Sequence, residues 1–298
     1  MRGLVPPTGV KPLQSFSPRH ARAPRRPRHS AASAGPASGR TATERWIYGR
    51  HAVAAALANP DRRWHRLAVL AGHEQEARAL VAAATAVRHG EGEPTRVLDR
   101  GDFVALLPEG AVHQGLALAV EPLAEPDLED VLCRAATHLG RSILVLLDQV
   151  SDPHNVGAVL RSASAFGALA VVLAIHGAPP VAGALAKAAS GALESVPLVR
   201  VVNLARALDR LKDASFWICG LDETAPQTLA ALNLGERVAL VLGSEGGGMR
   251  RLVRERCDHL ARLPTRTEQP TINVSNAAAV ALYELMRDDL KMRRAPIC

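Results

Sequence analysis

Long apolar runs, aromatic residues and paired cysteines are all scarce in this sequence. Only 3% of the 298 residues are aromatic although 48% are hydrophobic, so the core must consist mainly of Ala, Val and Leu side chains. The longest apolar stretches are too short to cross a bilayer, which argues against a membrane protein. The cysteines form no CxxC pair and have no His at ligand spacing; they are Cys133, Cys219, Cys257 and Cys298. We therefore expect reduced thiols, with neither a disulfide framework nor a metal site.

Acidic residues are absent from residues 1–43, which carry eight Lys and Arg side chains. The net charge of the whole chain is +7, so this tail's charge of +8 leaves about −1 for the rest. The tail is rich in Pro, Arg, Ser, Ala and Gly and has no apolar periodicity, which predicts a basic disordered tail. Three interpretations of it stay open: a non-specific RNA-binding arm, an organellar transit peptide, and a start codon assigned too far upstream.

Residues 44–122 have the pattern of a small α/β domain. Apolar runs predict strands at 66–70, 96–98 and 115–120. Helical periodicity predicts helices at 52–58, 73–88 and 102–107. An acidic linker and the lead-in to a second domain follow over 123–139.

Residues 140–292 alternate strand and helix patterns, which predicts an α/β domain with a parallel sheet covered on both faces. The strands are predicted at 143–147, 170–174, 197–202, 216–221 and 238–242. The helices are predicted at 155–166, 181–191, 204–213, 226–232, 249–256 and 274–290. In such a sheet, ligands bind beyond the carboxyl ends of the strands.

Three short polar segments follow strands or lead into helices of this second domain. Asn155, Gly157 and Arg161 place an amide and a guanidinium near the start of one helix, where they can hold a phosphate or a ribose. Gly243–Gly248 follows the most apolar strand but lacks the lysine of a P-loop and the GxGxxG spacing, which argues against an NTP or a dinucleotide. Residues 271–276 precede the last helix.

Each segment alone also has a purely structural interpretation. Asn155 is a good helix N-cap, Glu245 can cap the helix that starts near Met249, and Asn273 or Ser275 can cap the last helix. The occurrence of all three segments in this order favours one common site.

Together the three segments resemble the motifs of the SpoU (TrmH-type) family of RNA ribose 2′-O-methyltransferases, within the SPOUT superfamily. The family's Asn-x-Gly-x-x-x-Arg is found at 155–161, and its Leu-Gly-Ser-Glu-Gly at 242–246. Its third motif ends in Ser-Leu-Asn-Val-Ser and is matched by 271–275, where Thr271 replaces Ser and Ile272 replaces Leu. Thr keeps the hydroxyl group and Ile keeps the apolar contact.

Residues 46–120 are similar to the small substrate-binding domain that precedes the catalytic domain in many members. The marks of that similarity are Ile47–Val53 and Gln114-Gly115. This arrangement resembles the 23S rRNA guanosine 2′-O-methyltransferase branch more than the shorter tRNA branch.

The resemblance implies a knotted (trefoil) parallel-sheet methyltransferase domain preceded by a small α/β RNA-binding domain like ribosomal protein L30e. It implies a cytoplasmic homodimer that uses S-adenosyl-L-methionine to methylate a ribose 2′-hydroxyl in RNA, with 23S rRNA as the partner. Two alternatives stay open, a tRNA ribose methyltransferase of the same family and a catalytically silent RNA-binding protein. A nucleotide hydrolase is disfavoured because the P-loop lysine is absent.

The resemblance also implies roles for individual residues. The catalytic candidates are Asn155, Arg161, Glu245, Thr271 and Asn273. The cofactor-binding candidates are Leu242, Gly243, Leu263, Ile272 and Ser275. The RNA-binding candidates are Arg50, His51 and Arg161. A guanidinium stays protonated at neutral pH and is a poor base, so we expect Arg161 to bind the neighbouring phosphate and polarise the 2′-hydroxyl while another group or water accepts the proton.

Overall fold

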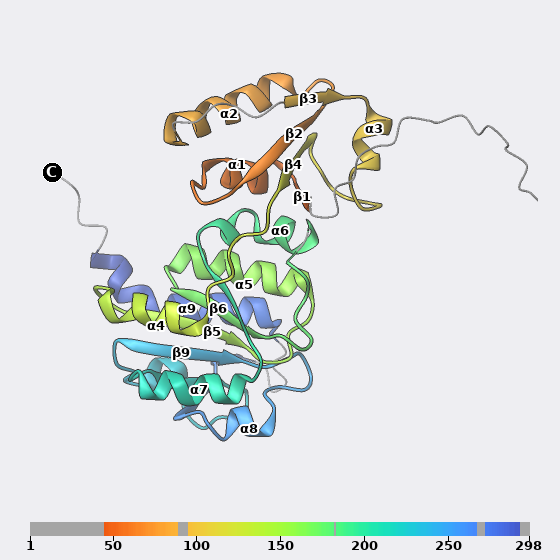
Figure 1. The fold of residues 1–298 in the computed structure, drawn as a ribbon. Coiled ribbons are helices and arrows are strands. Elements are labelled where there is room, and N and C mark those ends of the chain that lie inside the picture. The colour runs from red at the N-terminus through yellow and green to blue at the C-terminus, as the bar shows by residue number, and fades with distance from the viewer. Residues whose placement is uncertain (1–44, 89–94, 182, 267–271, 293–298) are drawn as a thin grey trace, which may run out of the picture. The chain divides into compact units, whose positions relative to one another are not determined.

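The computed structural model describes residues 45–88, 95–181, 183–266 and 272–292. All described residues belong to one compact unit, which lies within residues 41–298. The predicted basic tail (1–43) and Thr271 therefore lie outside the described residues. Within this unit the chain forms two β-sheets, one after the other along the sequence (Figure 1).

The first sheet has four strands in the order β1-β4-β2-β3. Strand β4 is antiparallel to both of its neighbours, and β2 is parallel to β3. The elements are β1 (Arg45–Tyr48), α1 (Arg50–Ala58), β2 (Trp64–Leu70), α2 (Glu74–Arg88), β3 (Thr95–Leu98), α3 (Arg100–Ala105) and β4 (Leu116–Val120). The sequence predicts all of them except β1, which is only four residues long and is held by its pairing with β4.

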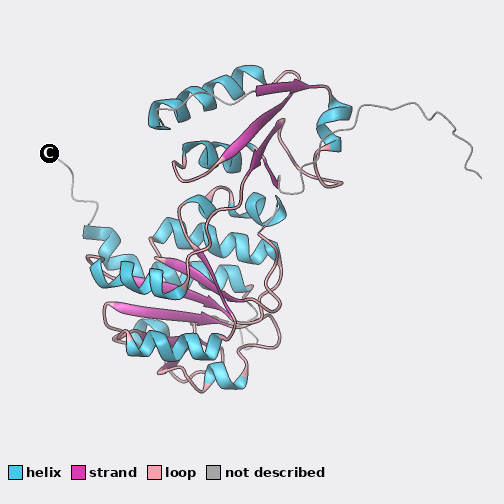
Figure 2. Ribbon diagram, in the orientation of Figure 1, coloured by secondary structure: helices cyan, strands magenta, loops and turns pink. Residues whose placement is uncertain are grey.

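The second sheet has six strands in the order β10-β8-β9-β5-β6-β7, and every pairing is parallel. The strands are β5 (Ser142–Leu147), β6 (Ala170–Ala174), β7 (Leu198–Val201), β8 (Trp217–Leu221), β9 (Arg237–Leu242) and β10 (His259–Ala261). The helices and 3-10 turns are α4 (Leu128–Thr137), α5 (Pro153–Phe166), α6 (Gly183–Ala189), η1 (Ala192–Glu194), α7 (Leu204–Asp213), η2 (Leu229–Ala231), α8 (Arg251–Arg254) and α9 (Val274–Met292). The parallel sheet predicted from the alternation of strands and helices is therefore confirmed (Figure 2).

Helices cover both faces of the second sheet. Ile143, Val145 and Leu147 of β5 lie in one apolar cluster with side chains of α5, α6 and α9. Leu144 and Leu146 of the same strand lie in a second cluster with side chains of α4 and α7. Burial on both faces explains why β5 and β9 are nearly continuous apolar runs rather than alternating ones.

Two predictions about this part of the chain need correction. Residues 226–232 form only the 3-10 turn η2 rather than a helix, because their backbone pairs with Arg262: Leu229 N donates to Arg262 O (3.0 Å), and Arg262 N donates to Gln227 O (2.9 Å). The predicted linker and lead-in at 123–139 contains α4, which begins with a capping box between Asp127 and Asp130.

A buried ion pair joins the first sheet to the second. Arg62, in the loop after α1, donates from Nη2 to Oε1 of Glu194 (2.6 Å) and from Nε to Oε2 (3.1 Å), and the two side chains are 6% and 8% exposed. Asn59 Nδ2 also donates to Glu194 Oε2 (2.7 Å). At a second contact, Lys187 Nζ of α6 donates to Gln114 Oε1 (3.0 Å), and burial lowers the pKa of Lys187. The two sheets are thus connected by oriented polar contacts as well as by the chain.

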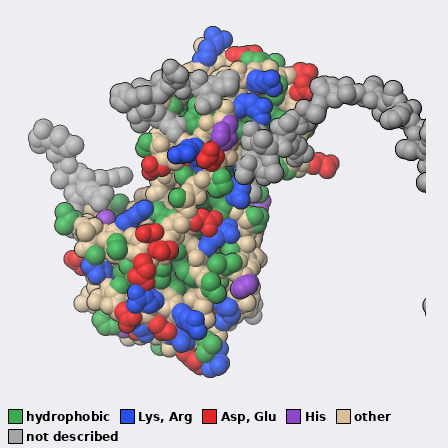
Figure 3. Space-filling model, in the orientation of Figure 1, with side chains coloured by type: hydrophobic (Ala, Val, Ile, Leu, Met, Phe, Trp, Pro, Cys, Tyr) green, Lys and Arg blue, Asp and Glu red, His purple; other side chains and the backbone are tan. Residues whose placement is uncertain are grey.

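Charged side chains of both signs are interspersed on the face drawn in Figure 3 rather than gathered by sign. No helix within the described ranges combines the length and the apolar character needed to span a bilayer. Cys133, Cys219 and Cys257 carry free thiols, and burial raises the pKa of both Cys219 and Cys257 to about 12. Those two thiols are therefore protonated at neutral pH.

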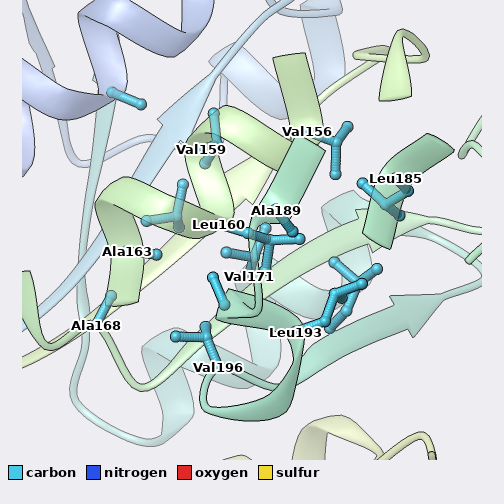
Figure 4. Packing of buried hydrophobic residues seen from close by; sticks show 14 of the residues in the cluster. Val156, Val159, Leu160, Ala163, Ala168, Val171, Leu185, Ala189, Leu193 and Val196 are labelled. Carbon is cyan, nitrogen blue, oxygen red and sulfur yellow. The ribbon is translucent and has the colours of Figure 1, made fainter. Parts of the chain in front are cut away.

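Gly157 lets α5 and α6 approach each other closely. Figure 4 shows apolar side chains around this contact, among them Val156 of α5 and Leu185 of α6. A Cβ at Gly157 would collide with Ala188, whose carbonyl carbon would lie only 2.8 Å away. The glycine of the first motif is therefore required by packing.

We predict that Gly157→Ala lowers the free energy of unfolding by about 1–3 kcal/mol, because the two helices must separate to admit the methyl group. Urea unfolding followed by circular dichroism measures this. Gly101→Ala in α3 is the matched control, because its Cβ would lie 3.4 Å from the nearest heavy atom, and it should cost nothing. A Gly157→Ala variant as stable as the parent would contradict the packing argument.

Candidate active site

The candidate site lies at the carboxyl ends of β5 and β9, the two central strands of the second sheet. Leu147 pairs with Leu242 at the ends of these strands. The segment after β5 leads to Asn155, and the segment after β9 is the glycine loop, Gly243–Gly248. This is the edge at which a ligand is expected in a parallel sheet.

One residue from each of the three predicted segments meets the others in a hydrogen-bond network. Asn273 Nδ2 donates to Glu245 Oε1 (2.6 Å) and to Asn155 Oδ1 (3.0 Å). Asn155 Nδ2 donates to the same Glu245 oxygen (3.3 Å). The structure thus brings together three residues that are up to 118 positions apart in the sequence.

The orientation of the Asn273 side chain is fixed from its other end. Its Oδ1 accepts hydrogen bonds from Ser275 N (2.9 Å) and Ser275 Oγ (2.6 Å) at the start of α9. Because the oxygen is occupied by these donors, the Nδ2 group must face Glu245 and Asn155. Asn273 therefore caps the last helix, as the structural interpretation holds, and also belongs to the network.

The structural interpretations of Asn155 and Glu245 are wrong. Helix α5 begins at Pro153, two residues earlier than predicted, and its cap is Asp152, whose carboxylate accepts from His154 N (3.0 Å). An Asp followed by Pro is a favourable start for a helix, so Asn155 lies inside the first turn with its side chain free for the network. Helix α8 begins at Arg251 without a side-chain cap, and Glu245 bonds to the two asparagines instead.

The glycine loop is closed on itself at its base. Ser244 N donates to Gly248 O (3.1 Å), and Gly248 N donates to Ser244 O (2.9 Å). A Cβ at Gly243 would collide with the backbone of Gly248, so only glycine allows this closure. Gly246 adopts a positive φ of 75°, and a Cβ there would meet nothing within 4 Å. The loop therefore presents open space beside Glu245.

Three of the predicted cofactor-binding residues, Leu242, Leu263 and Ile272, have apolar side chains. Leu242, buried at the end of β9, belongs to the apolar cluster that also holds α5 and α9, and Leu263 packs against that cluster. Ile272 is an apolar side chain with 40% of its surface exposed. Ser275 is engaged with Asn273, as described above.

Arg161 lies apart from the network, two turns further along α5, and lines an open cleft of about 1070 Å³. His51 of α1, Ser275 and Asn276 line the same cleft, so it adjoins the network through the start of α9. Arg161 is exposed and makes no hydrogen bond or ion pair with any residue that the structure describes. Arg50, the other predicted RNA-binding residue, does not line the cleft and pairs with Glu76 (2.8 Å).

Sequence reasoning missed a buried carboxylate at this edge of the sheet. Asp148 directly follows β5, is fully buried, and binds Arg250 just beyond the glycine loop. The signal in the sequence is an acidic residue placed directly after six apolar or small residues.

We predict that Asn273→Asp destabilises the protein by about 1 kcal/mol at pH 7, because it sets a second carboxylate against Glu245 at an exposed site. Two carboxylates that repel each other in the folded state bind a proton more readily there than in the unfolded chain. The loss is therefore present at pH 7 and disappears as the pH falls below about 4. Thermal unfolding at both pH values measures it.

The double variant Asn273→Asp with Glu245→Gln restores a donor–acceptor pair and should recover the parent's stability at pH 7. If the single variant melts like the parent at pH 7, the network does not form in solution.

Two sequence families cover most of the described chain. The SpoU rRNA Methylase family matches residues 142–283, and a family described as RNA 2′-O ribose methyltransferase substrate binding matches residues 46–126. The chain is 39% identical over 244 residues to a 23S rRNA (guanosine-2′-O-)-methyltransferase RlmB of Salmonella typhimurium, which covers 81% of this chain and 97% of that protein. It is 38% identical to an uncharacterized tRNA/rRNA methyltransferase of Synechocystis, of whose length it spans 62%.

Solved structures show the same fold. The SpoU methyltransferase AviRb from Streptomyces viridochromogenes, in complex with the cofactor AdoMet, superposes with a TM-score of 0.68 at 22% identity, over 84% of this chain and 91% of that one. The sequence identity to the rRNA methyltransferases, over nearly their full length, identifies the family. This chain belongs to the SpoU rRNA methylase family and is an RNA 2′-O-methyltransferase.

Proposed function

We propose that this protein methylates the ribose 2′-hydroxyl of a guanosine in 23S rRNA. The choice of substrate is supported by the 38–40% identity to relatives named 23S rRNA (guanosine-2′-O-)-methyltransferase RlmB. The chain matches these relatives over 97% of their length. The observation that carries the chemistry is the network of Asn155, Glu245 and Asn273 beside the glycine loop.

The residues around the glycine loop suit S-adenosylmethionine. Gly243 and Gly246 leave backbone and open space next to the loop, while the partly buried Leu263 and the exposed Ile272 offer apolar side chains for an adenine ring. When bound, the cofactor supplies an electrophilic methyl group on a sulfonium centre. The role of the protein is to hold the ribose 2′-hydroxyl in line with this methyl group and its sulfur.

A ribose hydroxyl is a poor nucleophile at neutral pH, so the site must orient it and accept its proton. Both amides of the network donate to Oε1 of Glu245. Its other oxygen, Oε2, has no hydrogen-bond partner among the described residues and is open to the hydroxyl or to a water molecule. We assign Asn155 and Asn273 the role of holding this carboxylate in place, and we assign the proton to Oε2 or to water bound there.

Arg161 is suited to bind the RNA phosphate next to the target ribose. Its guanidinium faces an open cleft and is not held by another side chain of the described chain. His51, from α1 of the small domain, lines the same cleft. Positive charge in a cleft attracts the RNA backbone irrespective of base sequence, which leaves base recognition to other parts of the small domain.

Several architectural features belong to the same proposal. We divide the chain into a small RNA-binding domain (44–122) and a methyltransferase domain (140–292), and the two sheets and the two family matches support this division. We further propose that the small domain is like ribosomal protein L30e and that the methyltransferase domain has a trefoil knot. We also propose a cytoplasmic homodimer. The support for a dimer is apolar surface on α9, where Val280 and Tyr283 are 51% and 53% exposed and Tyr283 contacts Phe166 of α5.

We predict that Arg161→Ala lowers kcat/KM for methyl transfer to 23S rRNA by about 10²-fold, because a positive charge next to the reacting ribose is lost. Arg161→Lys should stay within about tenfold of the parent if charge alone holds the phosphate, whereas loss as large as that of Ala would favour the planar guanidinium fork. The measurement is transfer of labelled methyl to 23S rRNA and tRNA transcripts, with mapping of the modified ribose.

Arg206→Ala is the control, because Arg206 is an exposed arginine on α7, which packs against the other face of the sheet. It should leave the rate unchanged. Methylation confined to tRNA would overturn the rRNA assignment and favour the tRNA alternative, and no methylation by a protein that binds RNA would favour the silent RNA-binding alternative.

A further inference from the structure

Asp148 is a buried acidic residue at the edge of the sheet where the candidate site lies. Its side chain is fully buried at the end of β5. It accepts two hydrogen bonds from Arg250, from the backbone N (2.7 Å) and from Nε (2.8 Å), and forms an ion pair with Nη2 (2.6 Å). A buried carboxylate is tolerated only with such partners, and removing one partner of a buried pair is strongly unfavourable. Arg250 itself is 48% exposed, so the pair is buried on one side only.

This pair ties together the two ends of the glycine loop. The loop leaves the sheet after Leu242, whose carbonyl oxygen accepts from Asp148 N (2.8 Å). The chain returns at Arg250, which is bound by the Asp148 carboxylate. The entrance and the exit of Gly243–Gly248 are therefore anchored to the same residue, one through its backbone and the other through its side chain.

The same residue also begins the segment that carries Asn155. Gln149, directly after Asp148, adopts a positive φ of 61°, a conformation that a residue other than glycine adopts only where its surroundings hold it. Asp152 then caps α5, and Asn155 follows in the first turn. Asp148 thus contacts the glycine loop that carries Glu245 and also begins the segment that leads to Asn155.

We propose that Asp148 is a positioning residue that holds the glycine loop, and Glu245 within it, in the conformation that binds S-adenosylmethionine. The inference rests on the proposed function, since the loop is assigned to the cofactor there. A loop that is already held in its binding conformation loses less conformational freedom when the ligand binds. Freeing the loop from Asp148 therefore weakens the affinity for the ligand even though every ligand contact can still form.

The test compares Asp148→Asn with Glu194→Gln. Both changes neutralise a buried carboxylate that is bound by an arginine, but Glu194 pairs with Arg62 at the joint between the sheets, away from the glycine loop. We expect both variants to lose thermal stability. Only Asp148→Asn should raise the Kd for S-adenosylmethionine, by about tenfold or more, measured by calorimetry well below both melting temperatures.

Hydrogen exchange of the cofactor-free protein gives a second readout. The amides of Ser244 and Gly248, which are bonded across the base of the loop, should exchange faster in Asp148→Asn and at the parent rate in Glu194→Gln. Should Asp148→Asn fail to fold, Arg250→Gln tests the same ion pair, which we call the clamp, by changing its partly exposed member. If Asp148 and Arg250 act as one clamp, Asp148→Asn with Arg250→Gln should lose no more affinity than Asp148→Asn alone.

An unchanged Kd in Asp148→Asn, or an equal loss of affinity in Glu194→Gln, would overturn the proposal and leave Asp148 a residue of general stability. A parent protein that binds no S-adenosylmethionine would instead overturn the proposed function itself, and the positioning role with it.

Discussion

The pairing of β5 with β9 is the constraint on which the site depends. Because the two strands are parallel and end opposite each other, at Leu147 and Leu242, the loops that follow them leave the sheet side by side. Only this arrangement allows a side chain of α5 to reach one in the glycine loop, 90 residues later. The start of α9 completes the set, because α9 packs against α5 on the same face of the sheet. One carboxylate oxygen, Oε1 of Glu245, then serves as the common acceptor.

Much of this arrangement follows from the sequence, and the reasons are local. Apolar runs of strand length, separated by helical patterns, predict the parallel sheet, and the carboxyl-end rule then predicts that the segments after β5 and β9 lie at the same edge. The third segment is joined to them by the order of the three motifs and by the family resemblance. The meeting of Asn155, Glu245 and Asn273 is confirmed at the level of geometry. Their chemical roles stay predictions, and Thr271 lies outside the described residues.

What the sequence does not predict depends on partners that are distant along the chain. Asp148 finds Arg250 102 residues later, and no periodicity marks such a pair. The Ala- and Leu-rich segment 226–232 has good helix propensity, yet its backbone pairs with Arg262 and only a short turn forms. Asn155 lies in the first turn rather than at the cap for a local reason, since the Asp-Pro pair at 152–153 starts the helix before the amide.

The buried pair of Arg62 and Glu194 has a consequence for how RNA arrives at the ribose site. A small domain on a flexible linker would explore a large volume, and the second binding step would be limited by the effective concentration that the linker allows. Here Arg62 and Asn59 attach that domain to Glu194 of η1 by oriented hydrogen bonds, and Asn59 and Glu194 line the same cleft as Arg161. Under the proposed function, an RNA held by the small domain is therefore presented to the catalytic domain at a high and nearly constant local concentration.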